Sequence, residues 1–565
     1  MSDTQTPAGT PEYLEYGGGS PIPPEPLPGA GAPARRSRRS WWIGGGVVAL
    51  LALGAGAWAA MGFFQQGSQP AEALPASTIA YVGIDLDPAG GQKIDAFRTL
   101  DKFPAFKDQV GIDSVDELRH KLGDSLVSGA GCDNLDYDHD IDPWLGNRAA
   151  FALVALPGSQ PDSVVVVQVN DDDQARAGIS ALAKCGAASG VPDTGFVVHD
   201  GWAVLAGSQD TAEKVVDATD EGTLADDATY QKWTKAVGEA GVVNAYAAPD
   251  AGRYLASRLG QLFGSPLSYG LVGPDPMAIP GDVPSLSVES GAFRATAATD
   301  DPFSDALSGF QGGAATLRFT GDGLELAVAA DGNAGQLSQL AGNTGGTLVQ
   351  RLPVDTAAAA GLTFPKGWLD RQLDQMSDLF GGVGVSKQQA MRQLSRATGL
   401  DVPDDVETLL GSGVSVAIGK DFDLEAAENS ADGTGLPIAV TVKGDPAAIE
   451  QVLDKVRAKT GDAPFLGSDS SGDLVVIGPS PAYRQHVLDG GSLGDDDTFQ
   501  SVVPDAGAAG QLFYVSIDAL EPSITQAAMG DQETIDNLTP LRAIGMSSWK
   551  ESDGVARFSV KVSTN

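Results

Sequence analysis

The chain of 565 residues carries 36 Lys and Arg against 74 Asp and Glu, which gives a formal net charge of −38. A field of this sign repels phosphate backbones and offers no basic patch to anionic lipid headgroups, so it argues against nucleic-acid binding. Hydrophobic residues make up 42% of the chain and recur in strand-like runs, which excludes a disordered acidic polymer.

The N-terminal residues 1–40 are rich in Pro, Gly and Ser and contain no run that could bury a core. This composition predicts a flexible, disordered tail. Its Pro-rich stretches leave open a second interpretation, in which the tail docks onto an aromatic groove of a partner.

Residues 41–64 form an uncharged apolar run that follows a basic cluster. As a helix this run would be about 36 Å long, enough to cross a hydrocarbon core of about 30 Å, so it predicts one transmembrane helix in contact with the lipid bilayer. The basic cluster predicts a cytoplasmic N-terminus, and hence an extracytoplasmic C-terminal region at the cell membrane. A cleaved signal peptide is the alternative, because Ala57-Trp58-Ala59 resembles a cleavage site. The cluster consists of Arg35, Arg36, Arg38 and Arg39.

The only two cysteines, Cys132 and Cys185, follow a short linker at residues 65–73 and belong to the region expected outside the cell. Thiols oxidise in that compartment, so we expect one disulfide between them. Closing the loop of about 50 residues between them would stabilise the fold by roughly 4 kcal/mol on the chain-entropy estimate. A reactive thiol or a metal-binding pair is the alternative.

The region beyond residue 73 contains related motifs in the same order twice. The pattern Leu-Pro-x-x-Thr occurs at residues 74–78 and again at residues 352–356. The closest pair is residues 222–231 and 491–500, which are identical at six of ten positions. Both series end in apolar strands around an Asp-Gly turn, at Asp322-Gly323 and at Asp553-Gly554. An internal duplication is therefore predicted.

The predicted fold class is α+β, with two tandem related copies after the transmembrane helix. We expect repeat A at residues 74–345 and repeat B at residues 346–565. Tight turns between the strands predict mostly antiparallel sheets, and helical stretches between the strands predict helices on one face of each sheet.

The order of tail, arginine cluster, apolar helix, Leu-Pro-x-x-Thr, Trp-Leu-Gly and Leu-x-Asp-Asp-x-Thr-Phe/Tyr-Gln resembles a family of uncharacterised actinobacterial membrane-anchored extracytoplasmic proteins, with a duplicated domain of unknown function. The resemblance covers nearly the whole chain and rests on the order of short motifs. It implies a location and a fold, and it carries over no catalytic residues.

A run of alternating acidic residues follows Cys132. In an extended segment these side chains would share one face, and oxygen ligands at that density suit Ca²⁺. The run is not an EF-hand loop, because Ile141 and Asn147 occupy the positions that require Gly and Glu. The alternative is a solvated acidic edge that discourages strand pairing. The four candidate calcium ligands are Asp136, Asp138, Asp140 and Asp142.

Catalytic motifs in the sequence fail on closer inspection. Ser492 lies in a Gly-x-Ser-x-Gly pattern near His486, but it follows a helical stretch and aligns with a turn residue of the other copy, whereas a hydrolase elbow leads from a strand into a helix. The acidic pairs 226–227 and 495–496 precede helical stretches, and we therefore interpret them as helix caps.

Three functional hypotheses remain. The first is a non-enzymatic module, tethered to the membrane, that binds an unknown envelope protein or ligand and has no cofactor, with calcium as the one exception considered. The second is a carrier or sensor of an apolar envelope ligand. The third is an envelope hydrolase whose carboxylates lie far apart in the sequence and leave no local motif.

Overall fold

The computed structural model describes residues 68–86, 90–104, 135–158, 160–188, 195–252, 310–332, 342–371, 374, 387–430, 433–461, 463–528 and 531–565. The predicted tail, the basic cluster at Arg35 to Arg39, residues 41–64 and Cys132 lie outside these ranges. Among the described residues, no helix has both the length and the apolarity needed to cross a bilayer, so the structure gives the predicted transmembrane helix no support.

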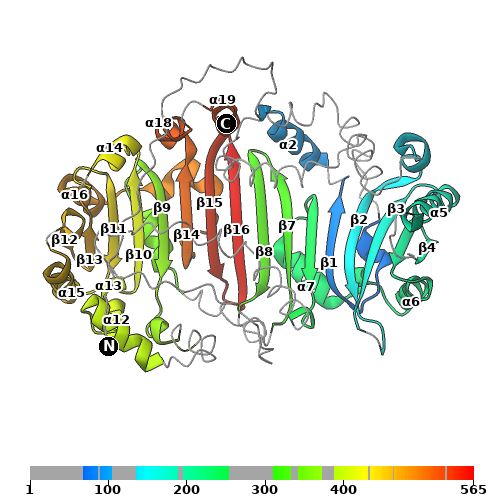
Figure 1. Ribbon diagram of the computed structural model, residues 1–565, viewed down its shortest axis with the longest axis horizontal. Coiled ribbons are helices and arrows are strands. Elements are labelled where there is room, and N and C mark those ends of the chain that lie inside the picture. Colours follow the sequence, from blue (N-terminus) through cyan, green and yellow to red (C-terminus); the bar gives the residue numbers. More distant parts are fainter. Residues whose placement is uncertain are drawn as a thin grey trace, which may run out of the picture. The chain divides into compact units, whose positions relative to one another are not determined.

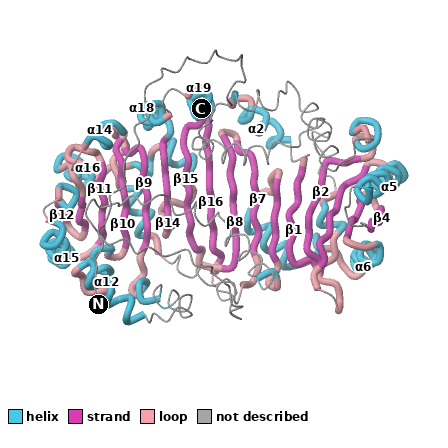
Figure 2. Tube along the Cα trace, viewed as in Figure 1, coloured by secondary structure: helices cyan, strands magenta, loops and turns pink. Residues whose placement is uncertain are grey.

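The strands form one antiparallel sheet of sixteen strands, in the order β12-β13-β11-β10-β9-β14-β15-β16-β8-β7-β6-β1-β2-β3-β5-β4. Figures 1 and 2 show them side by side. The strands are β1 Thr78–Asp85, β2 Leu145–Val154, β3 Asp162–Val169, β4 Gly195–His199, β5 Trp202–Ala206, β6 Val243–Ala247, β7 Gly313–Thr320, β8 Gly323–Asp331, β9 Thr356–Thr363, β10 Gly413–Gly419, β11 Ile438–Lys443, β12 Ser468–Ser471, β13 Leu474–Ile477, β14 Gln511–Ser516, β15 Leu541–Lys550 and β16 Val555–Thr564.

The predicted architecture of two tandem sheets is therefore wrong. Strands β1–β8 make one half of the sheet and β9–β16 make the other, and the halves join where β8 pairs with β16, from Asp331 opposite Val555 to Gly323 opposite Ser563. The strand order of one half, β4-β5-β3-β2-β1-β6-β7-β8, has the same form as β12-β13-β11-β10-β9-β14-β15-β16. The predicted hairpins at Asp322-Gly323 and Asp553-Gly554 are confirmed as the turns β7–β8 and β15–β16.

Helices pack on both faces of the sheet, which also corrects the prediction of helices on one face. They are α2 Gly90–Leu100, α5 Asp172–Ala188, α6 Gln209–Thr219, α7 Ala228–Val237, α10 Thr344–Gln350, α12 Lys387–Thr398, α13 Asp404–Leu410, α14 Leu424–Asn429, α15 Pro446–Thr460, α16 Pro481–Asp489, α17 Asp497–Val502, α18 Ile517–Ala527 and α19 Gln532–Leu538. Short turns of other helix types are η1 Pro70–Ala73, η2 Tyr137–Ile141, η3 Leu224–Asp226, η7 Pro464–Leu466 and η8 Leu493–Asp495.

We name the two faces of the sheet after Glu325 of β8 and Phe513 of β14. On the Glu325 face, α6 and α7 bury one apolar core with strands of the first half, and α10, α16 and α17 bury another with strands of the second half. On the Phe513 face, α5 packs on β3, β4 and β5 at one end of the sheet. At the other end of this face, α13 and α15 pack on β10, β11 and β13.

The repeated sequence motifs fold alike in the two halves. The Leu224 amide donates to the Leu74 carbonyl at 2.7 Å, and the Leu493 amide donates to the Leu352 carbonyl at 3.0 Å. All four leucines are buried, at 2% exposure or less. The Leu-Pro-x-x-Thr motif thus anchors the entry to each half's first strand against the Leu-x-Asp-Asp turn, which gives both motifs a structural role.

Candidate functional site

The central strands carry two rows of side chains on the Phe513 face, which are apolar except at Gln511 and Ser548. Directly paired residues of neighbouring strands project from the same face, so the register defines each row. The first row consists of Val416, Ala360, Phe513, Met546, Val560, Leu326, Leu317, Val243, Ile84, Ala149 and Val167, one from each strand between β10 and β3. The second row consists of Leu362, Gln511, Ser548, Phe558, Val328, Ala315, Ala245, Val82, Phe151 and Val165, between β9 and β3.

The two rows hold no charged side chain, and several of their members are exposed. In the first half of the sheet, Phe151 is 49% exposed, and its paired neighbours Val82 and Val165 are 44% and 39% exposed. In the second half, Leu362 and Phe513 are each 41% exposed. Large apolar side chains that are exposed and contiguous on a sheet mark a surface suited to binding.

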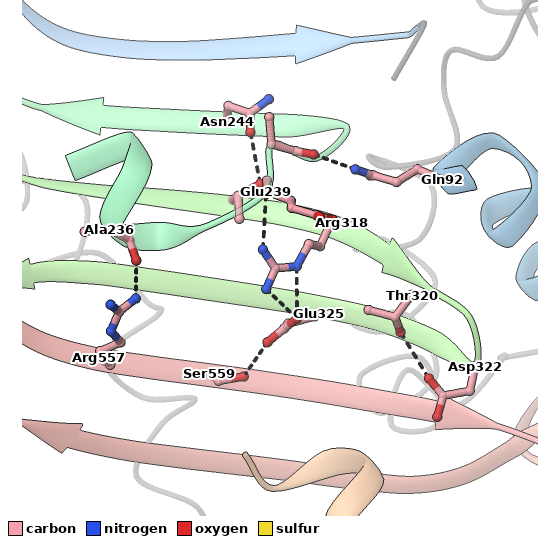
Figure 3. A network of polar contacts seen from close by, with 12 residues as sticks. Gln92, Ala236, Glu239, Asn244, Arg318, Thr320, Asp322, Glu325, Arg557 and Ser559 are labelled. Atoms are coloured by element: carbon pink, nitrogen blue, oxygen red, sulfur yellow. Dashed lines mark hydrogen bonds and ion pairs between the residues drawn. The ribbon is translucent and has the colours of Figure 1, made fainter. Parts of the chain in front are cut away.

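The Glu325 face carries charges that the two rows lack. Glu325 is 7% exposed and accepts hydrogen bonds from Arg318 Nη2 at 2.8 Å and from Ser559 Oγ at 3.1 Å (Figure 3). Arg557 of β16 donates to the Ala236 carbonyl in α7, so the network reaches across the junction of the two halves (Figure 3). In the first half, Arg148 Nε lies 3.0 Å from Asp85 Oδ2, and Arg148 is only 4% exposed.

The polarity of the central sheet therefore departs from the usual arrangement. An antiparallel sheet with one face on the core buries its apolar side chains and turns its polar ones to water. Here the acids, arginines and hydroxyls of β7, β8 and β16 share the covered Glu325 face with core residues such as Ala314 and Ala329, and exposed apolar side chains lie on the Phe513 face.

The predicted calcium ligands do not lie along one face of an extended segment. Tyr137–Ile141 is a helical turn and not an extended segment, so alternate residues do not share a face. Asp136 caps this turn by accepting from the His139 amide at 3.0 Å, and Asp140 Oδ2 accepts from the Asp136 amide at 2.9 Å. Across the described residues, no three His, Cys, Asp or Glu side chains converge in a way that could hold a metal ion.

The Gly-x-Ser-x-Gly pattern forms a turn between two helices. Ser492 precedes the 3-10 turn η8, which α17 follows, so it does not stand between a strand and a helix as a nucleophile elbow requires. His486 Nε2 lies 3.0 Å from Asp355 Oδ1, on a side chain that is 48% exposed. The motif thus builds the connection from α16 to α17.

The second residue of each acidic pair is a helix cap, as predicted. Asp227 begins α7 by accepting from the Tyr230 amide at 2.8 Å, and Asp496 begins α17 by accepting from the Phe499 amide at 2.9 Å. Each carboxylate satisfies an amide that has no partner within its helix and faces the positive end of the helix dipole.

Cys185 near the end of α5 is disulfide-bonded, and the chain contains one other cysteine, Cys132. Cys185 also packs against the apolar cluster that α5 forms with β4 and β5. The disulfide thus fastens the helix that covers one end of the Phe513 face.

Sequence reasoning missed the two rows, although a signal for them exists. In β16, apolar Phe558, Val560 and Val562 alternate with Ser559, Lys561 and Ser563, as expected for a strand with one polar and one apolar face. The alternation identifies which residues share a face. It does not identify the face that the helices cover.

Comparison with known proteins places the chain in a family without assigning it an activity. No curated protein and no solved structure matches it. One family model, described as "Protein of unknown function (DUF3352)", matches residues 43–456. This agrees with the expected resemblance to an uncharacterised family, and it does not bear on source, membrane anchoring or duplication. The match spans more than half of the chain, which therefore belongs to this family of proteins of unknown function.

Proposed function

We propose that this chain is a non-enzymatic binding protein that acts outside the cytoplasm, at the cell envelope, and that its partner or ligand binds the two rows of the Phe513 face. The observation that carries the proposal is the exposure of large, adjoining apolar side chains in the two rows. Each Å² of apolar surface left in water costs about 25 cal/mol, so a molecule that covers the rows gains binding free energy from their burial.

Two further observations support the proposal. The side chains that resembled catalytic motifs, Ser492 and the acidic pairs, serve in turns and caps. The disulfide at Cys185 favours an extracytoplasmic location, because disulfides persist in oxidising compartments.

The proposal is tested by the uncharged apolar dye Nile red, whose fluorescence rises when it leaves water. In the full chain, Phe513→Asp places a carboxylate in the first row and should lower dye binding several-fold. The matched control is Phe465→Asp, because Phe465 is 53% exposed and lies in η7, outside the rows. Equal dye binding by both variants would remove the rows as the binding surface. Thermal melts of both variants establish that they remain folded.

A further inference from the structure

We infer that the occupant of the two rows is the long acyl chain of a lipid with an uncharged or zwitterionic headgroup, lying across the strands and over the β8–β16 junction. This inference rests on the proposed function and adds the chemical class of the ligand. It follows from what the rows offer, from the length over which they offer it, and from the charge of the chain.

The first step concerns hydrogen bonding. A protein interface makes about one hydrogen bond per 100–200 Å². The only side chains of the two rows that can form hydrogen bonds are Gln511 and Ser548, and Ser548 is only 5% exposed. The backbone groups of the central strands already pair with neighbouring strands on both sides, so they cannot bind a peptide. A methylene chain needs no hydrogen-bond partner, so the scarcity of such groups costs it nothing, and only the exposed amide of Gln511 would lose water beneath it.

The second step concerns length. The first row is apolar throughout from β9 to β2, across the junction of the halves, and the second is interrupted at Gln511 and Ser548. At a spacing of about 4.8 Å between neighbouring strands, this stretch is on the order of 40 Å long. Along each strand, side chains of the two rows are about 7 Å apart, a separation that lets a slender chain contact both rows at once. Helices α5 and α15 pack on the same face toward the two ends of the sheet.

The third step concerns charge. The chain carries a formal net charge of −38, which repels anionic headgroups and also a second copy of the chain. Since the rows themselves are uncharged, the ligand's contact with them is apolar, and its headgroup lies away from the rows. A neutral or zwitterionic lipid satisfies both conditions.

The experiment measures by calorimetry how tightly the full chain binds alkylphosphocholines whose chains have eight, ten and twelve carbons. Roughly this range of lengths allows the effect of each added CH₂ to be compared below the concentration at which micelles form. Affinity should rise with chain length, by at most roughly fourfold per methylene, because each buried CH₂ contributes up to about that factor. Phe151→Asp and Phe513→Asp should each weaken binding, and Phe465→Asp should not. If an aspartate variant fails to fold, Leu362→Asn and Ile84→Asn replace it.

The outcomes separate the two proposals. Nile red binding that depends on Phe513, together with no alkylphosphocholine binding, would overturn the lipid inference and leave the binding surface in place for a protein partner. Alkylphosphocholine binding without chain-length dependence, or binding that Phe465→Asp weakens as much as Phe151→Asp and Phe513→Asp do, would also overturn it. Dye binding that is insensitive to every row substitution would overturn the proposed function itself.

Discussion

Glu325 illustrates at the scale of one residue how the sheet tolerates charge beneath helices. Its carboxylate is buried but accepts from Arg318 Nε at 3.0 Å and from Arg318 Nη2 at 2.8 Å, and Ser559 binds the other oxygen. A buried carboxylate is stable when paired and fully hydrogen-bonded, and costly when its partner is removed. The pair of Arg318 and Glu325 lies in the first half, and Ser559 of β16 connects it to the second half.

Replacing Arg318 by methionine should lower the free energy of unfolding by about 3–5 kcal/mol, because it leaves the Glu325 carboxylate buried without its cation. Chemical denaturation of the full chain measures the loss. The control is Lys214→Met, which removes an exposed pair with Asp210 and should change stability by no measurable amount. A loss for Arg318→Met no larger than for the control would contradict a stabilising role of the pair.

At the scale of elements, α13 is held against α15 by one lysine. Lys455 Nζ of α15 lies 2.7 Å from Asp405 Oδ2 and 3.3 Å from Asp401 Oδ2. Burial alone would raise the pKa of Asp405, but the hydrogen bonds from Lys455 and from the Asp401 amide outweigh it and lower that pKa. The pKa of Lys455 is raised, chiefly by its hydrogen bond to Asp405.

The stability that this pair contributes should depend on pH at both ends. The carboxylate's share is complete above its unfolded pKa of about 3.9 and is lost as the pH falls through the lower folded pKa. The ammonium's share is complete below its unfolded pKa of about 10.4 and is lost as the pH rises through the higher folded pKa. Lys455→Met should therefore lower the melting temperature near neutral pH, with a difference from wild type that shrinks in acid. An unfolded Asp titrates at about pH 3.9, so measurements from about pH 2 to pH 7 cover its titration. A difference in melting temperature that stays constant over this range would refute this account.

At the scale of the whole molecule, the β8–β16 ladder makes the two halves parts of one hydrogen-bonded sheet. Neither half can unfold without exposing the other's inner strand and breaking the contacts of Arg557 with α7. Parts of a protein that share such contacts unfold together as one cooperative unit.

Calorimetric heating of the full chain should accordingly give a single unfolding transition for the sheet. Substituting Val560, which lies opposite Leu326 at the junction, by proline should shift that transition as a whole, because a central strand tolerates no proline. Two separate transitions in the wild type, or a shift confined to part of the heat absorption in the variant, would show that the halves unfold independently.

Local features of this fold could be predicted from the sequence, and features that depend on distant pairing could not. The caps at Asp227 and Asp496 and the Asp-Gly hairpins follow from residue types within a few positions. The joining of the halves depends on β8 pairing with β16, whose paired residues Leu326 and Val560 are far apart in the chain. The extended conformation expected for the acidic run was wrong for a different reason, because Asp136 caps a helical turn there. The rows were missed because alternation assigns residues to faces without stating which face is covered.

The strand order also determines how the sheet protects itself from growing. Alone, each half would present a long outer strand, of nine residues in β8 or ten in β16, with a full line of unpaired backbone groups. Because β8 pairs with β16, neither strand is left as an edge. The outermost described strands are β12, with four residues, and β4, where Gln209 Oε1 accepts from the Phe196 amide. Short or capped edges are poor templates for amyloid-like addition. The protein can therefore expose an apolar surface for binding without exposing a long strand edge on which further chains could add as strands.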